Sequence, residues 1–236
     1  MLIYALISAI IISSISLVGI LLLRYKNISL YLVSLAAGAL LGDVFLHLIP
    51  EMKINSGASL LILLGFLIFF IIEKIIHWRH CQTENHGPHR HQPLATMNLI
   101  GDGLHNFLDG LIIAASFITS LPLGLASSIA IMFHEIPQEI GDFGVLLHAG
   151  LSRKKALLLN LASASLAILG VLMAFIINSD LIELLIPLAV GGFIYIAGVD
   201  LVPELHQEKQ IKKSAIQIAI FSLGVLLMLA LKIYGA

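Results

Sequence analysis

Two short polar segments, each in the middle of an apolar stretch, carry residue types that bind metal ions. They are residues 105–110, with the sequence HNFLDG, and residues 134–139, with the sequence HEIPQE. Residues four apart share one face of a helix, so His105 lies beside Asp109. Imidazole and carboxylate without thiolate suit divalent transition metals such as zinc, iron(II), manganese and cobalt. We therefore interpret the two segments as the two halves of one metal site.

Carboxylates at this depth in a membrane need a positively charged partner. A charged side chain at the centre of a membrane helix costs about 2.5–3.5 kcal/mol on insertion scales. Asp109, Glu135 and Glu139 lie at similar depth, whereas the Lys and Arg residues lie at the membrane edges. Clustered carboxylates repel one another unless a cation is bound. Hydrogen bonding between helices would explain Asn106 or Gln138 singly, but not the carboxylates, so we favour a bound metal over a proton.

The composition places these segments in a membrane protein. The chain has 236 residues, of which 59% are hydrophobic and 11% are charged, whereas soluble domains carry about 25% charged residues. We expect one all-α transmembrane domain over residues 1–236, embedded in a lipid bilayer, with eight apolar stretches that each cross it. The expected spans are residues 3–23, 30–50, 58–77, 97–119, 123–148, 156–177, 181–201 and 214–234. No basic patch with interleaved aromatic residues indicates nucleic-acid binding, and the single cysteine excludes an intrachain disulfide.

Basic residues are concentrated on one side of the predicted membrane. The loops after spans one, three, five and seven, with the helix ends beside them, contain Arg24, Lys26, Lys74, Arg79, Arg90, Arg153, Lys154, Lys155, Lys209, Lys212 and Lys213. The opposite side contains only Lys53 and Lys232. By the positive-inside rule, those four loops are cytoplasmic and both termini are extracytoplasmic.

The cytoplasmic loop predicted at residues 78–96 is rich in histidine. Together with His77, it contains half of the ten histidines of the chain. Histidine-rich tracts bind metal as a class, and we expect a low-affinity acceptor or sensor here. The alternative is a solvated linker whose histidines are incidental.

Further polar residues lie on or near the same helices. Asp102 precedes His105 by one turn and Asp142 follows Gln138 by one turn. The pair either extends a polar track inward or simply lies near helix ends. Other candidates for metal uptake and release lie toward helix ends, where charges are commonplace. They are Asp43, His47 and Glu51 near the outer face, and His148, Asp200, Glu204 and His206 near the inner face.

The second and seventh spans end in similar sequences. Residues 48–51 read LIPE and residues 201–204 read LVPE. Since the second span runs outward and the seventh runs inward, the two Pro-Glu corners lie at opposite mouths. Inverted repeats are a common plan of alternating-access transporters. We therefore expect spans one to three and spans six to eight to be related, with spans four and five between them.

Enzymatic interpretations fit the spacing poorly. Residues 134–138 resemble the HExxH motif of zinc proteases, but Gln138 replaces the second histidine and Pro137 interrupts the helix. No nucleotide-binding motif occurs in a suitable context, so we expect neither an enzyme nor an ATP-driven pump. The alternatives to a transporter are a membrane-embedded zinc-dependent hydrolase that uses His134 and Glu135, and a metal channel.

These motifs resemble those of the ZIP family of divalent-metal transporters, the ZRT/IRT-like proteins. Residues 105–110 are similar to that family's fourth-helix pattern H-N-F-x-D-G, and residues 134–139 are similar to the fifth-helix pattern H-E-x-P-H-E of one subgroup. The resemblance covers essentially the whole chain, including the eight spans and the histidine-rich third loop. It implies a 3+2+3 helix arrangement, a homodimer, an elevator-type motion and import of metal across the cell or inner membrane into the cytoplasm.

The resemblance also implies a set of ligands, for one metal ion or two, by position. The implied ligands are His105, Asn106, Asp109, His134, Glu135 and Gln138. Gln138 departs from the subgroup, which has histidine there. An amide oxygen is a harder and weaker ligand than imidazole, so selectivity is expected to move from zinc toward iron or manganese unless Glu139 or a water compensates. Zinc is the expected cargo of alternating access, with iron(II), manganese and cadmium as alternatives.

Overall fold

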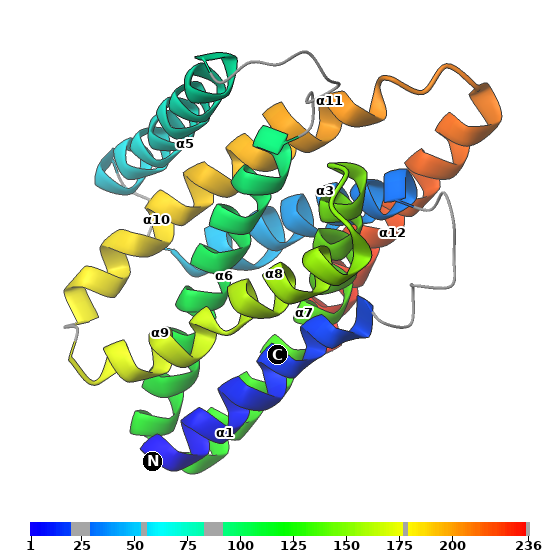
Figure 1. The fold of residues 1–236 in the computed structure, drawn as a ribbon. Coiled ribbons are helices and arrows are strands. Elements are labelled where there is room, and N and C mark those ends of the chain that lie inside the picture. The colour runs from blue at the N-terminus through cyan, green and yellow to red at the C-terminus, as the bar shows by residue number, and fades with distance from the viewer. Residues whose placement is uncertain (20–28, 53–55, 83–91, 177–178, 235–236) are drawn as a thin grey trace.

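The computed structural model describes residues 1–19, 29–52, 56–82, 92–176 and 179–234, and every regular element in these ranges is helical (Figure 1). Within these ranges the elements join end to end into eight rods that correspond to the eight predicted spans. The first four rods are α1 (Leu2–Ser13) with η1 (Ser14–Val18); α3 (Ser29–Asp43) with η2 (Val44–Leu48) and α4 (Ile49–Glu51); α5 (Ser56–Gln82); and α6 (Gln92–Thr119). The other four are α7 (Leu121–His148); α8 (Arg153–Ala164) with α9 (Leu166–Ala174); α10 (Ser179–Tyr195) with η3 (Ile196–Leu201) and α11 (Val202–Leu205); and α12 (Ile211–Tyr234). The predicted all-α fold is confirmed.

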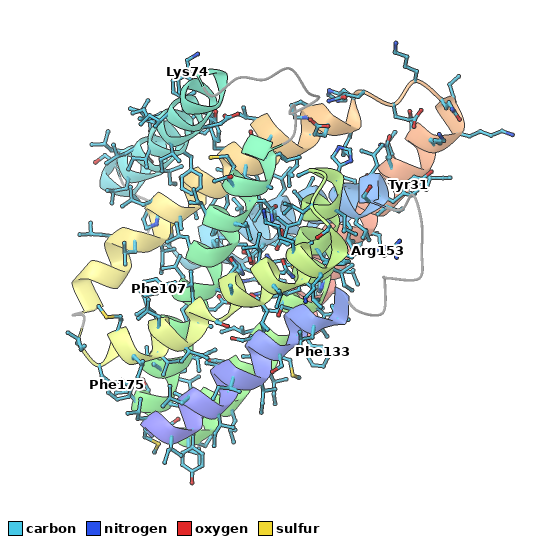
Figure 2. The ribbon with its side chains drawn as sticks, viewed as in Figure 1. Tyr31, Lys74, Phe107, Phe133, Arg153 and Phe175 are labelled. Atoms are coloured by element: carbon cyan, nitrogen blue, oxygen red, sulfur yellow. The ribbon has the colours of Figure 1, made fainter. Side chains whose placement is uncertain are left out.

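Length and apolar composition make the chain a multi-pass membrane protein. Among the described residues, the stretches long and apolar enough to cross a membrane are Ser29–Leu48, Ser56–Ile75, Arg153–Ala174, Leu184–Leu205 and Ile211–Ile233, and Leu2–Val18 is a shorter apolar helix. The helices α6 and α7 carry the two polar segments, whose histidines, amides and carboxylates lower their mean hydropathy. Large apolar side chains cover the outer surface, among them Phe133 and Phe175, which are 50% and 46% exposed (Figure 2). Such a surface suits lipid and not water.

The helices α5 and α6 are longer than the spans predicted from hydropathy. The helix α5 continues to Gln82 and α6 begins at Gln92, so both extend into the predicted loop at residues 78–96. Backbone hydrogen bonding continues past the end of an apolar stretch, because it does not depend on the hydropathy of the side chains. Residues 83–91, with three of the loop's histidines, lie outside the described residues, so the metal-binding role of this loop stays a prediction.

Two π-helical turns lie at matching places in the second and seventh rods. The turn η2 comes just before Pro50, and η3 comes just before Pro203. Proline has no N–H to donate to the carbonyl four residues earlier, and its ring crowds that carbonyl, so the preceding turn widens. The LIPE and LVPE sequences therefore accompany the same distortion in both helices.

Glycines bring α6 and α7 close to their neighbours. A Cβ on Gly110 of α6 would lie 2.0 Å from the carbonyl oxygen of Ala167 in α9, and a Cβ on Gly170 of α9 would lie 2.0 Å from the backbone of α6. A Cβ on Gly141 of α7 would lie 2.7 Å from the Cα of Ala36 in α3. Close approach through small residues is the usual way in which membrane helices associate. It fixes α6 against α9 and α7 against α3.

Candidate metal centre

The two helices that carry the polar segments are neighbours joined by a tight turn at Ser120. The Ser120 hydroxyl caps α7 by accepting a hydrogen bond from the Leu123 N–H at 3.3 Å. His105 and Glu135 are equally far in sequence from this turn, so the constant rise of the two helices brings them to the same level. The turn and the helix period together place the two segments opposite each other.

Four side chains converge between α6 and α7, and we call them the four-residue cluster. They are His105 and Asp109 of α6 and His134 and Glu135 of α7, each with a ligand atom within 4.8 Å of the other three. His134 Nε2 lies 3.1 Å from Asp109 Oδ2 and 3.3 Å from His105 Nε2. His105 Nε2 lies 3.6 Å from Asp109 Oδ2 and 3.4 Å from Glu135 Oε1. His134 Nε2 lies 3.8 Å from the same Glu135 oxygen.

These separations are those of ligand atoms around one small ion. Zinc bonds to imidazole nitrogen and carboxylate oxygen are about 2.0–2.2 Å long, so the edges of a tetrahedral ligand shell are about 3.3–3.6 Å. Five of the six distances between these atoms run from 3.1 to 3.8 Å, and the sixth, between the Asp109 and Glu135 oxygens, is at most 4.8 Å. Two imidazole nitrogens 3.3 Å apart face each other with their lone pairs unless a proton or a metal lies between them. The cluster therefore has the donor set and the dimensions of a tetrahedral zinc site.

Burial excludes most water from the cluster. His105 and Asp109 are each 5% exposed and Glu135 is 1% exposed, while His134 is half-buried. Within the described residues, the ion pairs of Asp109 and Glu135 are with the two histidines of the cluster. Buried carboxylates require charge compensation, and a bound cation supplies it.

A third helix contributes a carboxylate behind the cluster. Asp43 of α3 is 2% exposed, and its Oδ2 lies 3.9 Å from His105 Nδ1, the ring nitrogen that faces away from the cluster. Its Oδ1 lies 3.3 Å from His47 Nδ1. The Asp43–His105 contact is electrostatic and not a hydrogen bond, and the negative charge favours the orientation of His105 that turns Nε2 toward the cluster. We predicted Asp43 near the outer mouth of the second span, and the structure instead buries it beside the cluster.

The other three predicted ligands lie beside the cluster and make different contacts. The Asn106 amide nitrogen donates to the Asp102 carbonyl oxygen at 3.1 Å and to Asp102 Oδ1 at 2.8 Å, and the Asn106 Oδ1 has no hydrogen-bond partner. The Glu139 carboxylate accepts a hydrogen bond from the side-chain amide of Asn160 in α8. Gln138 is 7% exposed, and neither its amide nitrogen nor its amide oxygen has a hydrogen-bond partner. Their role as ligands stays a prediction.

Two of the residues predicted near the inner face lie together. His148 Nε2 is 3.0 Å from Glu204 Oε2, so the end of α7 is joined to α11. Asp200 is half-buried in η3, and His206 is exposed just after α11. The contact links the helix that carries His134 to the rod that contains the LVPE sequence.

The fold and the four-residue cluster define the class of protein: an integral membrane protein in which side chains of α6 and α7 form a group that could hold a metal ion. The sequence model of the ZIP zinc transporter family matches residues 1–96 and 79–232. The chain belongs to this family, and the resemblance seen in its fourth and fifth spans is confirmed. Because the members are transporters, the prediction that the chain is not an enzyme is also confirmed.

Three proteins similar to the chain are also named zinc transporters. The chain is 33% identical over 224 residues to the zinc transporter ZIP13 of Pongo abelii, a match that covers 86% of this chain and 66% of that protein. It is 31% identical over 241 residues to the zinc transporter YKE4 of Saccharomyces cerevisiae, with 84% and 69% covered. It is 34% identical over 247 residues to the zinc transporter ZIP4 of Mus musculus, with 73% and 37% covered. The chain thus spans about two thirds of the first two relatives and little more than a third of the last.

Proposed function

We propose that this chain imports divalent transition-metal ions, zinc first, across the membrane into the cytoplasm by alternating access. The observation that carries the proposal is the convergence of two imidazole nitrogens and two carboxylate oxygens, 3.1–3.8 Å apart along the measured edges, between two helices of a membrane bundle. The family, and the named zinc transporters similar to the chain, support zinc. Iron(II), manganese and cadmium are the alternative cargoes, because Gln138 stands where the subgroup has histidine.

In this proposal the ion exchanges its hydration water for the four-residue cluster in the middle of the membrane. Imidazole and carboxylate bind metal in their deprotonated forms, so binding displaces protons, and acidification releases the ion. The negative charge of Asp43, 3.9 Å from His105 Nδ1, favours the ring orientation with Nε2 toward the ion. Access then alternates as α6 and α7 shift against the flanking helices.

We extend the proposal to the 3+2+3 arrangement of inverted repeats. If spans one to three correspond to spans six to eight, the packed pair α5 and α10 corresponds to the packed pair α12 and α3. Both pairs meet through glycine: a Cβ on Gly65 would lie 2.0 Å from the Leu188 carbonyl oxygen, and a Cβ on Gly38 would lie 2.1 Å from the Phe221 carbonyl oxygen. The matching π-helical turns before Pro50 and Pro203 are a second correspondence, so both packing and backbone support the repeat.

The proposal also covers location and assembly. We place the chain in the cell or inner membrane with both termini outside, because the exposed Lys74, Arg153, Lys154 and Lys209 lie at the ends that the positive-inside rule assigns to the cytoplasm. A homodimer is proposed from the resemblance to the family.

Zinc flux into proteoliposomes tests the proposed function. Asp109→Asn keeps the shape of the side chain and removes the charge that compensates the ion, so we expect flux to fall almost to that of empty vesicles. Glu208→Gln is the matched control, because Glu208 lies outside the spans, 3.6 Å from Lys213, and its flux should equal that of the parent. Parent-like flux in Asp109→Asn would remove the cluster from the transport path.

Metal selectivity tests position 138. Gln138→His supplies the imidazole of the subgroup, and we expect the ratio of zinc to manganese flux to rise above that of the parent. An identical ratio would show that the side chain at position 138 touches no ion. The same assay separates a carrier from a channel, since flux through a carrier saturates at low zinc.

A further inference from the structure

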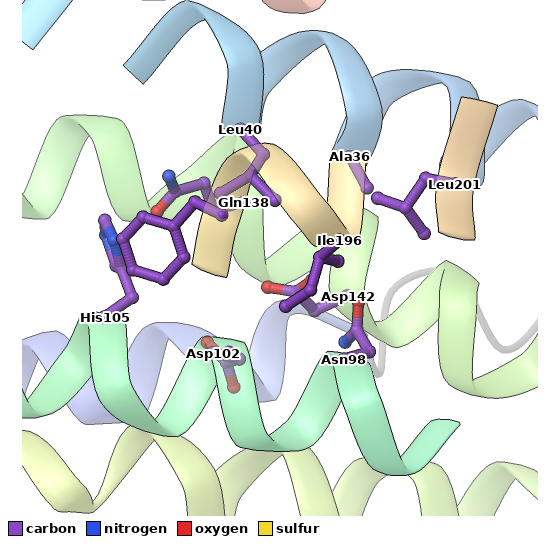
Figure 3. A pocket seen from close by; sticks show the side chains of 11 residues that line it. Ala36, Leu40, Asn98, Asp102, His105, Gln138, Asp142, Ile196 and Leu201 are labelled. Carbon is purple, nitrogen blue, oxygen red and sulfur yellow. The ribbon is translucent and has the colours of Figure 1, made fainter. Parts of the chain in front are cut away.

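A small cavity lies next to the four-residue cluster, and α6 and α7 supply its polar lining. Asn98 and Asp102 line it from α6, and Gln138 and Asp142 line it from α7 (Figure 3). His105 also lines the cavity, so a single residue belongs to both the cavity and the cluster. The remaining wall is largely apolar and comes from α3 and from the rod of α10 and η3. We call Asn98, Asp102, Gln138 and Asp142 the cavity residues.

Several polar atoms of the cavity residues are buried without a hydrogen-bond partner. They include both amide atoms of Gln138, Asp102 Oδ2 and Asn98 Nδ2. These three residues are only 7%, 9% and 3% exposed. Native proteins leave few buried polar groups unpaired, and a group of them around one cavity indicates an occupant that supplies the missing interactions.

The charge of the cavity identifies the kind of occupant. Asp102 and Asp142 bring two carboxylates from facing helices, and none of the described residues that line the cavity is Lys or Arg. The carboxylate and amide oxygens are acceptors and suit a cation better than an anion, whereas the unpartnered amide nitrogens of Asn98 and Gln138 are donors that water bound to the cation would satisfy. With His105 as the one nitrogen ligand in reach, the donor set is dominated by oxygen, which binds divalent cations less selectively than the two imidazoles of the cluster.

The positions of Asp102 and Asp142 in the chain show on which side of the four-residue cluster the cavity lies. Asp102 comes before His105 on α6, and Asp142 comes after Gln138 on α7. Because the two helices run in opposite directions, Asp102 and Asp142 both lie toward the side of the membrane on which α6 begins and α7 ends. The loops on that side are the ones whose basic residues indicate the cytoplasm.

We propose that the cavity residues form a second divalent-cation site, weaker than the four-residue cluster, which receives the ion from His105 on its way to the cytoplasm. The inference rests on the proposed function, because it names the next position of the same ion. Asp102, Asp142 and the Gln138 amide oxygen supply the protein ligands, and waters complete the shell.

Equilibrium dialysis of the purified chain in detergent, with zinc measured by mass spectrometry, tests the second site. In a background in which His80, His86, His89 and His91 are replaced by alanine, so that the histidine-rich loop takes up no zinc, we expect the chain to bind a tight and a weaker equivalent of zinc. Asp102→Asn with Asp142→Asn should lose the weaker equivalent and keep the tight one, and Asp142→Asn alone should weaken only the second. Glu208→Gln is the control for loss of a carboxylate. Circular dichroism and size-exclusion chromatography establish that each variant is folded.

Manganese provides a second readout that favours oxygen ligands. The electron paramagnetic resonance signal of free Mn²⁺ should fall when the parent is added, and it should fall less with folded Asp142→Asn. If the background without the loop histidines binds a single equivalent of zinc, or Asp142→Asn binds both metals as the unsubstituted cavity does, the cavity holds only water or a proton and the inference is overturned. In that case Asp109→Asn still tests the proposed function separately, because this variant should lose the tightly bound equivalent of zinc.

Discussion

Asp43 lies on the opposite side of the His105 ring from the four-residue cluster. At 3.9 Å its buried carboxylate makes an electrostatic contact with Nδ1 and no hydrogen bond, and its charge favours a proton on Nδ1, which leaves Nε2 free to bind metal. Removal of the charge therefore weakens the ligand without removing it. Asp43 thus adds a negative charge from α3 to a metal centre whose other residues lie on α6 and α7.

We predict that Asp43→Asn lowers zinc affinity by about 10- to 100-fold, the range for residues behind metal ligands. Competition with a chromophoric zinc chelator measures this affinity on the purified chain. Ser34→Ala, earlier on the same helix, is the control, because among the described residues the Ser34 hydroxyl bonds within α3, to the Leu30 carbonyl oxygen at 3.0 Å. Equal zinc affinities of the parent and Asp43→Asn would contradict the role of Asp43.

The residues of the cluster were predictable because their positions follow from local spacing. His105 and Asp109 share a face at four residues' separation, and the polar segment of the next span meets them across a short turn. The contact of Asp43 was not predictable, since it depends on how α3 packs against the pair. Glu139 was predicted at the depth of Glu135, where it could compensate for Gln138. Its hydrogen bond to Asn160 of α8 is a tertiary contact that helix periodicity does not reveal.

The close contact of α6 with α9 helps to position the site at the scale of helices. Gly110 closes the first polar segment and packs against the backbone of Ala167. A methyl group there would push α9 away from α6 and would tilt the helix that carries His105 and Asp109.

We expect Gly110→Ala to destabilise the folded chain by about 1–3 kcal/mol, as overpacking does, and to lower zinc flux. Thermal unfolding in detergent measures the first effect. Gly198→Ala is the control, because a Cβ at Gly198 has no atom within 4 Å, and its melting temperature should stay close to that of the parent. A parent-like melting temperature for Gly110→Ala would show that α6 and α9 are less tightly packed than the structure describes.

Hydropathy predicted the number and order of the helices, but not their ends or distortions. Apolar stretches set the length of chain inside the bilayer, whereas α5 and α6 continue into polar sequence. The LIPE and LVPE repeat was visible in the sequence. That both copies follow a π-helical turn was not predicted, because the widening depends on how the backbone relieves the proline clash.

The orientation of the whole chain determines which end of the cavity faces the cytoplasm. We predict that, in a Cys81→Ser background, Ser56→Cys reacts with a membrane-impermeant maleimide on intact cells. Lys154→Cys should react only after the membrane is opened. Both positions are exposed in the structure. The reverse pattern would invert the proposed path and place the cavity residues on the outer side.

The transport proposed for the whole molecule requires the four-residue cluster to bind zinc, and zinc K-edge X-ray absorption tests this requirement directly. With one equivalent of zinc bound to the purified chain, we predict four nitrogen or oxygen neighbours at about 2.0–2.2 Å, two of them with the multiple scattering of imidazole. Asp109→Asn should alter this shell, and Glu208→Gln should leave it unchanged. A six-oxygen shell, or a spectrum without imidazole scattering, would contradict the assignment of the metal centre to His105, Asp109, His134 and Glu135.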